Sequence, residues 1–183
     1  MQEFAEATNQ TVDEVSKKYN KTVENSENSG IIKLTDDEQR AINSYISSGS
    51  YVVNEKLRSG IALTPDETKF VADLESALVK MPKYSGNLSR SVYFDDNEKF
   101  TEFINKHKVG STITYKAFTS TTKGSIYNDK ANVQIYVKNA KSGADISKYN
   151  VAEQETLYKT NSKFIVENIG NYGNTIHIFL KEK

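Results

Sequence analysis

The stretch "TPDETKFVADLESALVKMP", residues 64–82, decides the fold class, because the sequence pattern changes at its end. Thr64 is a predicted helix N-cap, Pro65 suits the first helical position, and Glu67 completes a capping box. Apolar side chains recur at helical spacing along it, namely Phe70, Val71, Leu74, Ala77, Leu78 and Met81. The pattern predicts a helix that buries this stripe and ends before Pro82.

Two further helices are predicted on the N-terminal side of this segment. The run "TDDEQRAINSYI" (35–46) begins with Thr35 and Glu38 in a second capping box. The run "SYVVNEKLRSG" (50–60) also has helical spacing and ends at a glycine. Residues 1–30 are polar and end in the turn-rich "NSENSG", which predicts a weak helix followed by a linker. The division expected is therefore a polar leader, 1–30, and one domain, 31–183.

After Pro82 the helical pattern gives way to short alternating runs. A helix is predicted for "NEKFTEFINKH" (97–107), and strands are predicted for 87–94, 111–121, 132–138, 155–160, 163–169 and 174–183. Helices followed by strands indicate an α+β domain, in which sheets pack on each other and on the leading helices.

Composition limits the chemistry that the chain can perform. The 24 lysines and arginines balance 24 aspartates and glutamates, so bulk charge gives no basis for binding nucleic acid or an anionic membrane. The chain has no cysteine and only two histidines, so neither a disulfide nor a metal site is expected. Neither a spanning segment nor an export signal is expected from the sequence given. Catalysis would have to depend on carboxylates, hydroxyls and cations.

Two patterns suggest a site. In "VAEQETLY" (151–158), Glu153 and Glu155 are two apart, so in an extended segment they share one face, either as an acid/base pair or as a solvated surface. Arg90 is predicted within an alternating strand that has Leu88 and Val92 on the same face. A guanidinium there is costly unless an anion or a carboxylate pairs with it, as a ligand or as a structural ion pair.

Several segments, in this order, resemble the R-S-E class of bacterial ADP-ribosyltransferase exoenzymes, which includes C3-like toxins and the catalytic components of actin-modifying binary toxins. The segments are "TDDEQRAINSYI", "YVVNEKLRSG", "TPDETKF", "LESALVK", "NLSRSVYF", "AFTSTT" and "VAEQETLY". The resemblance covers roughly residues 31 to 183 and implies N-terminal helices followed by two packed mixed sheets. It also implies an enzyme that cleaves NAD at the nicotinamide-ribose bond and transfers ADP-ribose to a protein side chain.

The resemblance assigns roles to individual residues. Glu155 is similar to the catalytic glutamate that contacts the ribose, and Ser120 to the serine that steadies this carboxylate. Arg90 is similar to the arginine that holds the dinucleotide through its phosphates. Arg58 resembles a second phosphate-binding arginine, although helix-surface arginines are common, and Asn54 would present an amide to the same cleft.

Glu153 bears on the choice of acceptor. Family members with glutamate at this place tend to modify arginine, and a second carboxylate could bind a guanidinium and take its proton. Tyr127 is available to stack on the nicotinamide ring, or is an ordinary loop aromatic. The chain departs from the family pattern at Thr122, where serine is usual, and at Asn150, where an aromatic residue is frequent.

Two other functions remain open at this stage. An NAD glycohydrolase would use the same arginine, serine and glutamate with water as acceptor, and a non-catalytic binding module could keep the fold alone. The expected partners are NAD and an unidentified protein acceptor, without a metal, and the chain is expected to be a monomer. The resemblance implies a protein that is secreted or delivered into a target cell, or a phage protein acting in its host.

Overall fold

The structure, a computed structural model, describes residues 32–124, 128 and 130–183. The helix and linker predicted within residues 1–30 and the side chain of Tyr127 lie outside these residues. The chain divides into two units, the larger of which runs from Leu34 to Lys183 and is the unit described below. The domain boundary predicted between residues 30 and 31 stays a prediction.

The helices confirm the local signals of the sequence. They are α3 (Asp36–Ser44), α4 (Ser50–Ser59) and α5 (Pro65–Lys80), followed after the first strand by α6 (Asn97–Lys106). Both predicted capping boxes are formed, one by Thr35 with Glu38 and one by Thr64 with Glu67. Helix α4 ends at Gly60, which takes a left-handed conformation with φ 71° that a residue with a Cβ atom disfavours.

A π-helical turn, η1 (Tyr45–Gly49), joins α3 to α4 and was not predicted. Gly49 allows this turn, because a Cβ atom there would lie 2.5 Å from the Ser44 hydroxyl oxygen. The Ser50 hydroxyl donates to the carbonyl of Tyr45 at 3.2 Å across the turn. Such turns are rare and often occur at functional sites.

A buried glutamate ties α3 to α5. Glu38 is 4% exposed and accepts hydrogen bonds from the Ser76 hydroxyl at 2.6 Å and from Lys80 Nζ at 2.7 Å. The bond from Lys80, followed by that from Ser76, lowers the pKa of Glu38 to about 2. The capping residue of the first helix therefore also fixes how the two helices pack.

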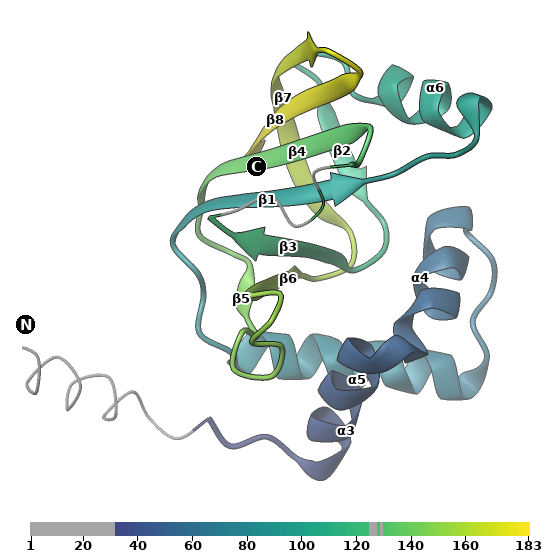
Figure 1. Ribbon diagram of the computed structural model, residues 1–183. Helices are drawn as coiled ribbons and strands as arrows, with labels where there is room; N and C mark the ends of the chain where they lie inside the picture. Colours follow the sequence, from purple (N-terminus) through teal and green to yellow (C-terminus); the bar gives the residue numbers. More distant parts are fainter. Residues whose placement is uncertain (1–31, 125–127, 129) are drawn as a thin grey trace, which may run out of the picture. The chain divides into compact units, whose positions relative to one another are not determined.

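The strands form one mixed sheet in the order β2-β7-β8-β4-β1-β3-β6-β5, in which only the β4–β8 pair is parallel (Figure 1). Their bounds are β1 (Gly86–Val92), β2 (Thr112–Tyr115), β3 (Thr119–Lys123), β4 (Val133–Ala140), β5 (Ala144–Asp145), β6 (Glu155–Tyr158), β7 (Ser162–Tyr172) and β8 (Thr175–Glu182). The α+β class, with helices before strands, is confirmed.

A short ladder joins β1 to β3. These strands pair only at Leu88 with Lys123 and at Ser89 with Thr122. One sheet therefore replaces the two expected, but it consists of two halves that are joined by this short ladder. Helices α3, α4 and α5 lie beside the half that carries β3 and β6, and α6 lies at the opposite end near β7 (Figure 1).

The single strand predicted for residues 111–121 is wrong. The structure divides it into β2, which pairs with β7, and β3, which pairs with β1 and β6. Between them Phe118 is 3% exposed and its ring packs edge-on against Tyr45, with centroids 5.9 Å apart. This burial against η1 redirects the chain, which the alternation of the sequence does not reveal.

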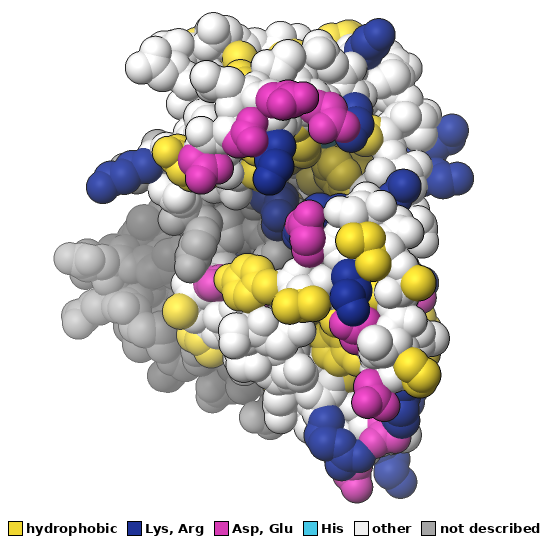
Figure 2. Space-filling model, turned by 90° about the vertical axis from the view of Figure 1, so that its right-hand side faces the viewer, with side chains coloured by type: hydrophobic (Ala, Val, Ile, Leu, Met, Phe, Trp, Pro, Cys, Tyr) yellow, Lys and Arg dark blue, Asp and Glu magenta, His cyan; other side chains and the backbone are white. Residues whose placement is uncertain are grey.

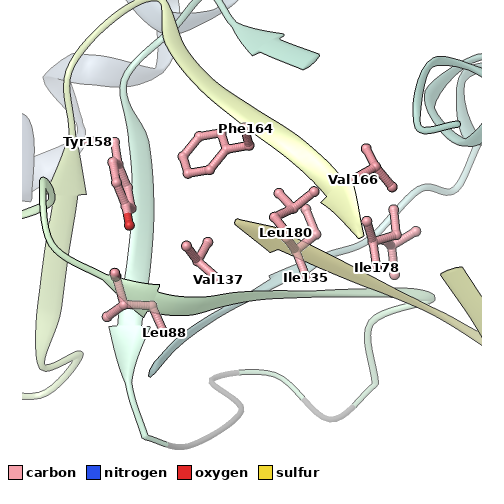
Figure 3. Close-up of a cluster of buried hydrophobic side chains, with 10 residues drawn as sticks. Leu88, Ile135, Val137, Tyr158, Phe164, Val166, Ile178 and Leu180 are labelled. Atoms are coloured by element: carbon pink, nitrogen blue, oxygen red, sulfur yellow. The ribbon is translucent and has the colours of Figure 1, made fainter. Parts of the chain in front are cut away.

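The main core is a cluster of buried side chains from both halves of the sheet (Figure 3). Its buried members come from β1, β4, β6, β7 and β8: Leu88, Val133, Ile135, Val137, Ala140, Tyr158, Phe164, Val166, Ile178 and Leu180. Helix α6 packs Phe100, Phe103 and Ile104 against this cluster. His107 follows α6 and is satisfied by the Phe103 carbonyl and the Tyr115 hydroxyl, at 2.7 and 2.8 Å.

Candidate active site

One cavity of about 290 Å³ contains every predicted site residue that the structure describes. Its strand wall comes from β1, β3, β6 and the turn before β6, and its helix wall comes from η1 and α4. The predicted residues that line it are Asn54, Arg58, Arg90, Ser120, Glu153 and Glu155. Tyr127 lies outside the described residues. Segments separated by about a hundred positions in the sequence thus converge, as the predicted site requires.

Glu155 is the buried carboxylate of the cavity. It opens β6, pairs with Thr122 of β3 and is 2% exposed. Because residues opposite each other share a face, and because side chains alternate along a strand, Ser120 lies on the same face as Glu155. Burial raises the pKa of Glu155 above its usual range, while hydrogen bonding from Ser120 and Asn150 opposes this rise. The negative charge of Glu153 adds to it.

The two glutamates line the same cavity, although only one of them lies in a strand. The strand begins at Glu155, as predicted for 155–160, whereas residues 151–154 form a turn, so Glu153 and Glu155 do not share one extended segment. Gln154, between the two glutamates, has a left-handed φ of 47° that breaks the two-residue alternation. The Thr122 hydroxyl donates to the Glu153 carbonyl at 2.5 Å and holds the turn against β3. Thr122 therefore supplies the hydroxyl expected at this position.

Arg90 lies where the backbones of β1 and β3 separate. The ladder between these strands stops at Ser89, and the guanidinium of the next residue donates from Nη1 to the Ser120 carbonyl at 2.7 Å. Burial lowers the pKa of Arg90, which remains charged because arginine has so high a pKa in water. A desolvated cation is thus fixed directly beside the residue predicted to orient Glu155.

The helix wall presents an arginine and an amide. Arg58 is half-exposed and pairs with Glu55 on its own helix at 3.0 Å. Asn54 is buried, and its Oδ1 has no hydrogen-bond partner within the described part of the chain. A ligand with a hydrogen-bond donor would satisfy such an atom.

Two residues in contact with this network were not predicted as site residues. Tyr45 is 8% exposed, and burial, aided by the charge of Glu155, raises its pKa. Asn150 donates from Nδ2 to Oε2 of Glu155 at 3.1 Å. Tyr45 lies in the π-helical turn η1, and Asn150 lies on the irregular loop before β6. The sequence gives no local signal for either element.

The surroundings carry charges of both signs. Figure 2 shows acidic and basic side chains interspersed, not gathered by sign, on the side that it presents. Among the described residues, no group of three or more candidate side chains could hold a metal ion. None of the described helices is both long and apolar enough to cross a membrane.

The cavity combines a buried carboxylate, a fixed guanidinium and a second carboxylate. This combination suits the cleavage of a bond that leaves positive charge on a sugar.

Comparison with known proteins identifies a family whose model covers most of the chain. The family model described as ADP-ribosyltransferase exoenzyme matches residues 9–180. The chain is 27% identical over 150 residues to NAD(+)--protein-arginine ADP-ribosyltransferase Tre1 of Serratia proteamaculans (strain 568), covering 81% of this chain and 32% of that protein. It therefore spans about a third of that relative's length.

Solved structures share the fold. The ADP-ribosyltransferase Vis in complex with agmatine superposes with a TM-score of 0.67 at 23% identity, covering 95% of this chain and 86% of Vis. Exoenzyme S from Pseudomonas aeruginosa, in complex with human 14-3-3 protein beta and bound to carba-NAD, superposes with a TM-score of 0.68 at 18% identity. That match covers 85% of this chain and 77% of exoenzyme S.

Proposed function

This chain belongs to the ADP-ribosyltransferase exoenzyme family, and from that premise we propose that it transfers ADP-ribose from NAD to an arginine side chain of a protein. The observation that carries the proposal is the single cavity that gathers Arg90, Ser120, Glu153 and Glu155. Each of these residue types has a separate task in the reaction.

Glu155 is the proposed catalytic carboxylate. When the bond between nicotinamide and ribose breaks, nicotinamide leaves with the bonding electron pair and the ribose carbon becomes positively charged. A carboxylate held beside the ribose stabilises that charge most effectively where water is excluded. The burial of Glu155 supports this role, and a hydrogen bond from the Ser120 side chain opposes the rise in the pKa of Glu155 that burial causes.

Arg90, Arg58 and Asn54 are the proposed groups that bind NAD. A guanidinium matches the diphosphate with parallel hydrogen bonds, and Arg90 is fixed close to Glu155 by its bond to the Ser120 carbonyl. Arg58 would reach the same phosphates from the helix wall, and Asn54 would offer its unpartnered oxygen. The neighbouring fold of exoenzyme S bound to carba-NAD supports NAD as the substrate. Stacking of nicotinamide on Tyr127 stays a prediction.

Glu153 is the proposed residue for the acceptor. A guanidinium is protonated at neutral pH and cannot attack until it loses a proton. Glu153 would bind the guanidinium, accept this proton and leave a nitrogen free to attack the ribose carbon. The relative that is named an arginine transferase and the complex of Vis with agmatine, a small guanidine, support this acceptor. The target protein and a site of action in another cell stay predictions.

The proposal is tested with purified protein, labelled NAD and agmatine as a model acceptor. We expect nicotinamide release together with labelled agmatine, measured by chromatography. Glu155→Gln should lower both products by at least about 10²-fold, because the group that meets the developing charge is lost. Glu153→Gln should abolish agmatine labelling while NAD hydrolysis continues.

The matched control is Glu167→Gln, which changes an exposed glutamate on β7 outside the cavity and should leave both rates unchanged. A reaction that releases free ADP-ribose, but labels neither agmatine nor any protein of a lysate, would identify a glycohydrolase instead. Absence of NAD cleavage by the unmodified chain would contradict the proposal and favour a binding module.

A further inference from the structure

We propose that Asn150 is a positioning residue whose side-chain amide holds the Glu155 carboxylate toward the sugar. The inference deepens the proposed function and rests on it. Asn150 stands on the loop between β5 and β6, five residues before Glu155, and it also lines the cavity. Its Nδ2 donates to Oε2 of Glu155 at 3.1 Å.

The loop backbone fixes the position from which this amide donates. The amide nitrogens of Tyr149 and Asn150 both donate to the carbonyl of Ile146, at 2.8 and 3.3 Å. The amide nitrogen of Ile146 in turn donates to the carbonyl of Glu155 at 3.1 Å, which closes the loop. Ile146 itself is 1% exposed and anchors the loop in the protein interior. The Asn150 side chain is therefore held in place before any ligand binds, and little entropy is lost when it acts.

A neutral donor is suited to the charges around Glu155. Arg90 faces it from β1, Glu153 from the preceding turn and Tyr45 from η1, while Arg58 lines the same cavity from α4. Burial and the charge of Glu153 disfavour the ionised form of Glu155, whereas the hydrogen bond from the Asn150 amide favours it. Because the amide is neutral, it adds no positive charge near the one that develops on the ribose. The amide of Asn150 thus opposes the rise in the pKa of Glu155 without placing a positive charge beside the carboxylate.

This geometry separates two possible tasks of Asn150. A residue that recognises the acceptor would affect transfer alone, because water needs no recognition. A residue that positions Glu155 would affect the breaking of the NAD bond, which hydrolysis and transfer share. Since the amide is donated inward to Glu155, the structure assigns the second task.

The first experiment measures nicotinamide release from NAD against pH for the unmodified chain, Asn150→Leu and Asn150→Asp. Leucine keeps the approximate volume and removes the donor, so the acid limb of the profile should move up by about one pH unit. Aspartate places a like charge beside Glu155 and should move the limb further. Hydrolysis and agmatine transfer should fall by the same factor at each pH, about tenfold at pH values below the acid limb.

The matched control is Val151→Ala, whose exposed side chain follows Asn150 in the loop between β5 and β6 and whose profile should be unchanged. A second readout does not require activity: the ¹³C resonance of the Glu155 carboxyl, assigned with Glu155→Gln, is titrated in the unmodified chain and in Asn150→Leu. An upward displacement of its midpoint in the variant confirms the hydrogen bond in solution.

The outcomes separate the inference from the proposed function. If the unmodified chain cleaves NAD but Asn150→Leu shifts neither the acid limb nor the carboxyl titration, the positioning role is wrong and the proposed function stands. Loss of transfer with hydrolysis unchanged would also overturn the inference, since it assigns Asn150 to the acceptor. If the unmodified chain does not cleave NAD, the proposed function fails and the role of Asn150 fails with it.

Discussion

The strand wall and the helix wall of the cavity are built in different ways. On the strand wall, Arg90 donates to the Ser120 carbonyl, and Glu155 accepts from Asn150, so the groups fix one another. On the helix wall, Arg58 is paired only with Glu55 one turn away on the same helix, and its side chain is 49% exposed. For the proposed reaction, this difference predicts that the strand wall is preorganised for bond breaking, whereas the helix wall adapts to the ligand.

The largest effect on catalysis is expected from a substitution of Arg90, which lies where β1 and β3 separate. Arg90→Lys keeps the charge but removes the planar fork, and an ammonium cannot serve the Ser120 carbonyl and a diphosphate with the same geometry. We expect kcat/KM for NAD to fall about 100-fold, with kcat and KM both affected, because the serine beside Glu155 also loses its anchor. Steady-state kinetics of nicotinamide release measures this.

The control for this substitution is Arg40→Lys. Arg40 lies on α3 outside the cavity, is 71% exposed on its side chain and pairs with Asp37 three residues earlier. It should show unchanged kinetics. A change in KM alone for Arg90→Lys would contradict the link between Arg90 and the proposed catalytic carboxylate.

A smaller effect is expected on stability: loss of the Glu155 carboxyl should lower activity but raise the free energy of unfolding. Because burial raises the pKa of Glu155, the folded protein holds its proton to a higher pH than the unfolded chain. Stability is therefore lost as the pH rises through the folded-state pKa, when the buried carboxyl must ionise. Glu155→Gln should raise the free energy of unfolding by about 1 kcal/mol at neutral pH, at the expense of activity.

The pH dependence identifies the cause of this gain. Below the unfolded-state pKa both states are protonated, so the advantage of Glu155→Gln should disappear near pH 4. Denaturant unfolding followed by circular dichroism at both pH values measures the difference between variant and unmodified chain. An equal gain at both pH values would mean that packing, not ionisation, is responsible, and Glu167→Gln should show no gain at either.

The same contrast explains how much of the molecule the sequence predicts. The helices could be predicted because their signals are local: Thr35 with Glu38, Thr64 with Glu67, and the glycine after α4 all lie within a few residues of what they define. The candidate site could be predicted because its residue types recur in order along the family pattern. Once the chain adopts the fold of the family, these residues come together in one cavity.

The features that could not be predicted depend on contacts between distant segments. Phe118 leaves the strand pattern because it packs on Tyr45, more than seventy positions away. The turn that carries Glu153 is held in place by Thr122. Its left-handed residue is Gln154, and not a glycine or an asparagine, so the residue type does not indicate this conformation. Alternation in the sequence indicated that the glutamates converge, but only tertiary contacts determine that one is in a strand and the other in a turn.

The smallest effect is expected on the helix wall. Arg58→Ala should raise KM for NAD about threefold with kcat unchanged, because an exposed arginine that binds a phosphate contributes the same in the ground and transition states. Glu55→Ala is the informative companion, since it removes the partner that competes with the diphosphate for Arg58 and should lower KM or leave it unchanged. If Arg58→Ala instead reduced kcat as strongly as Arg90→Lys, the two walls would not differ in the way their contacts indicate, and the helix wall would have to close over NAD before the bond breaks.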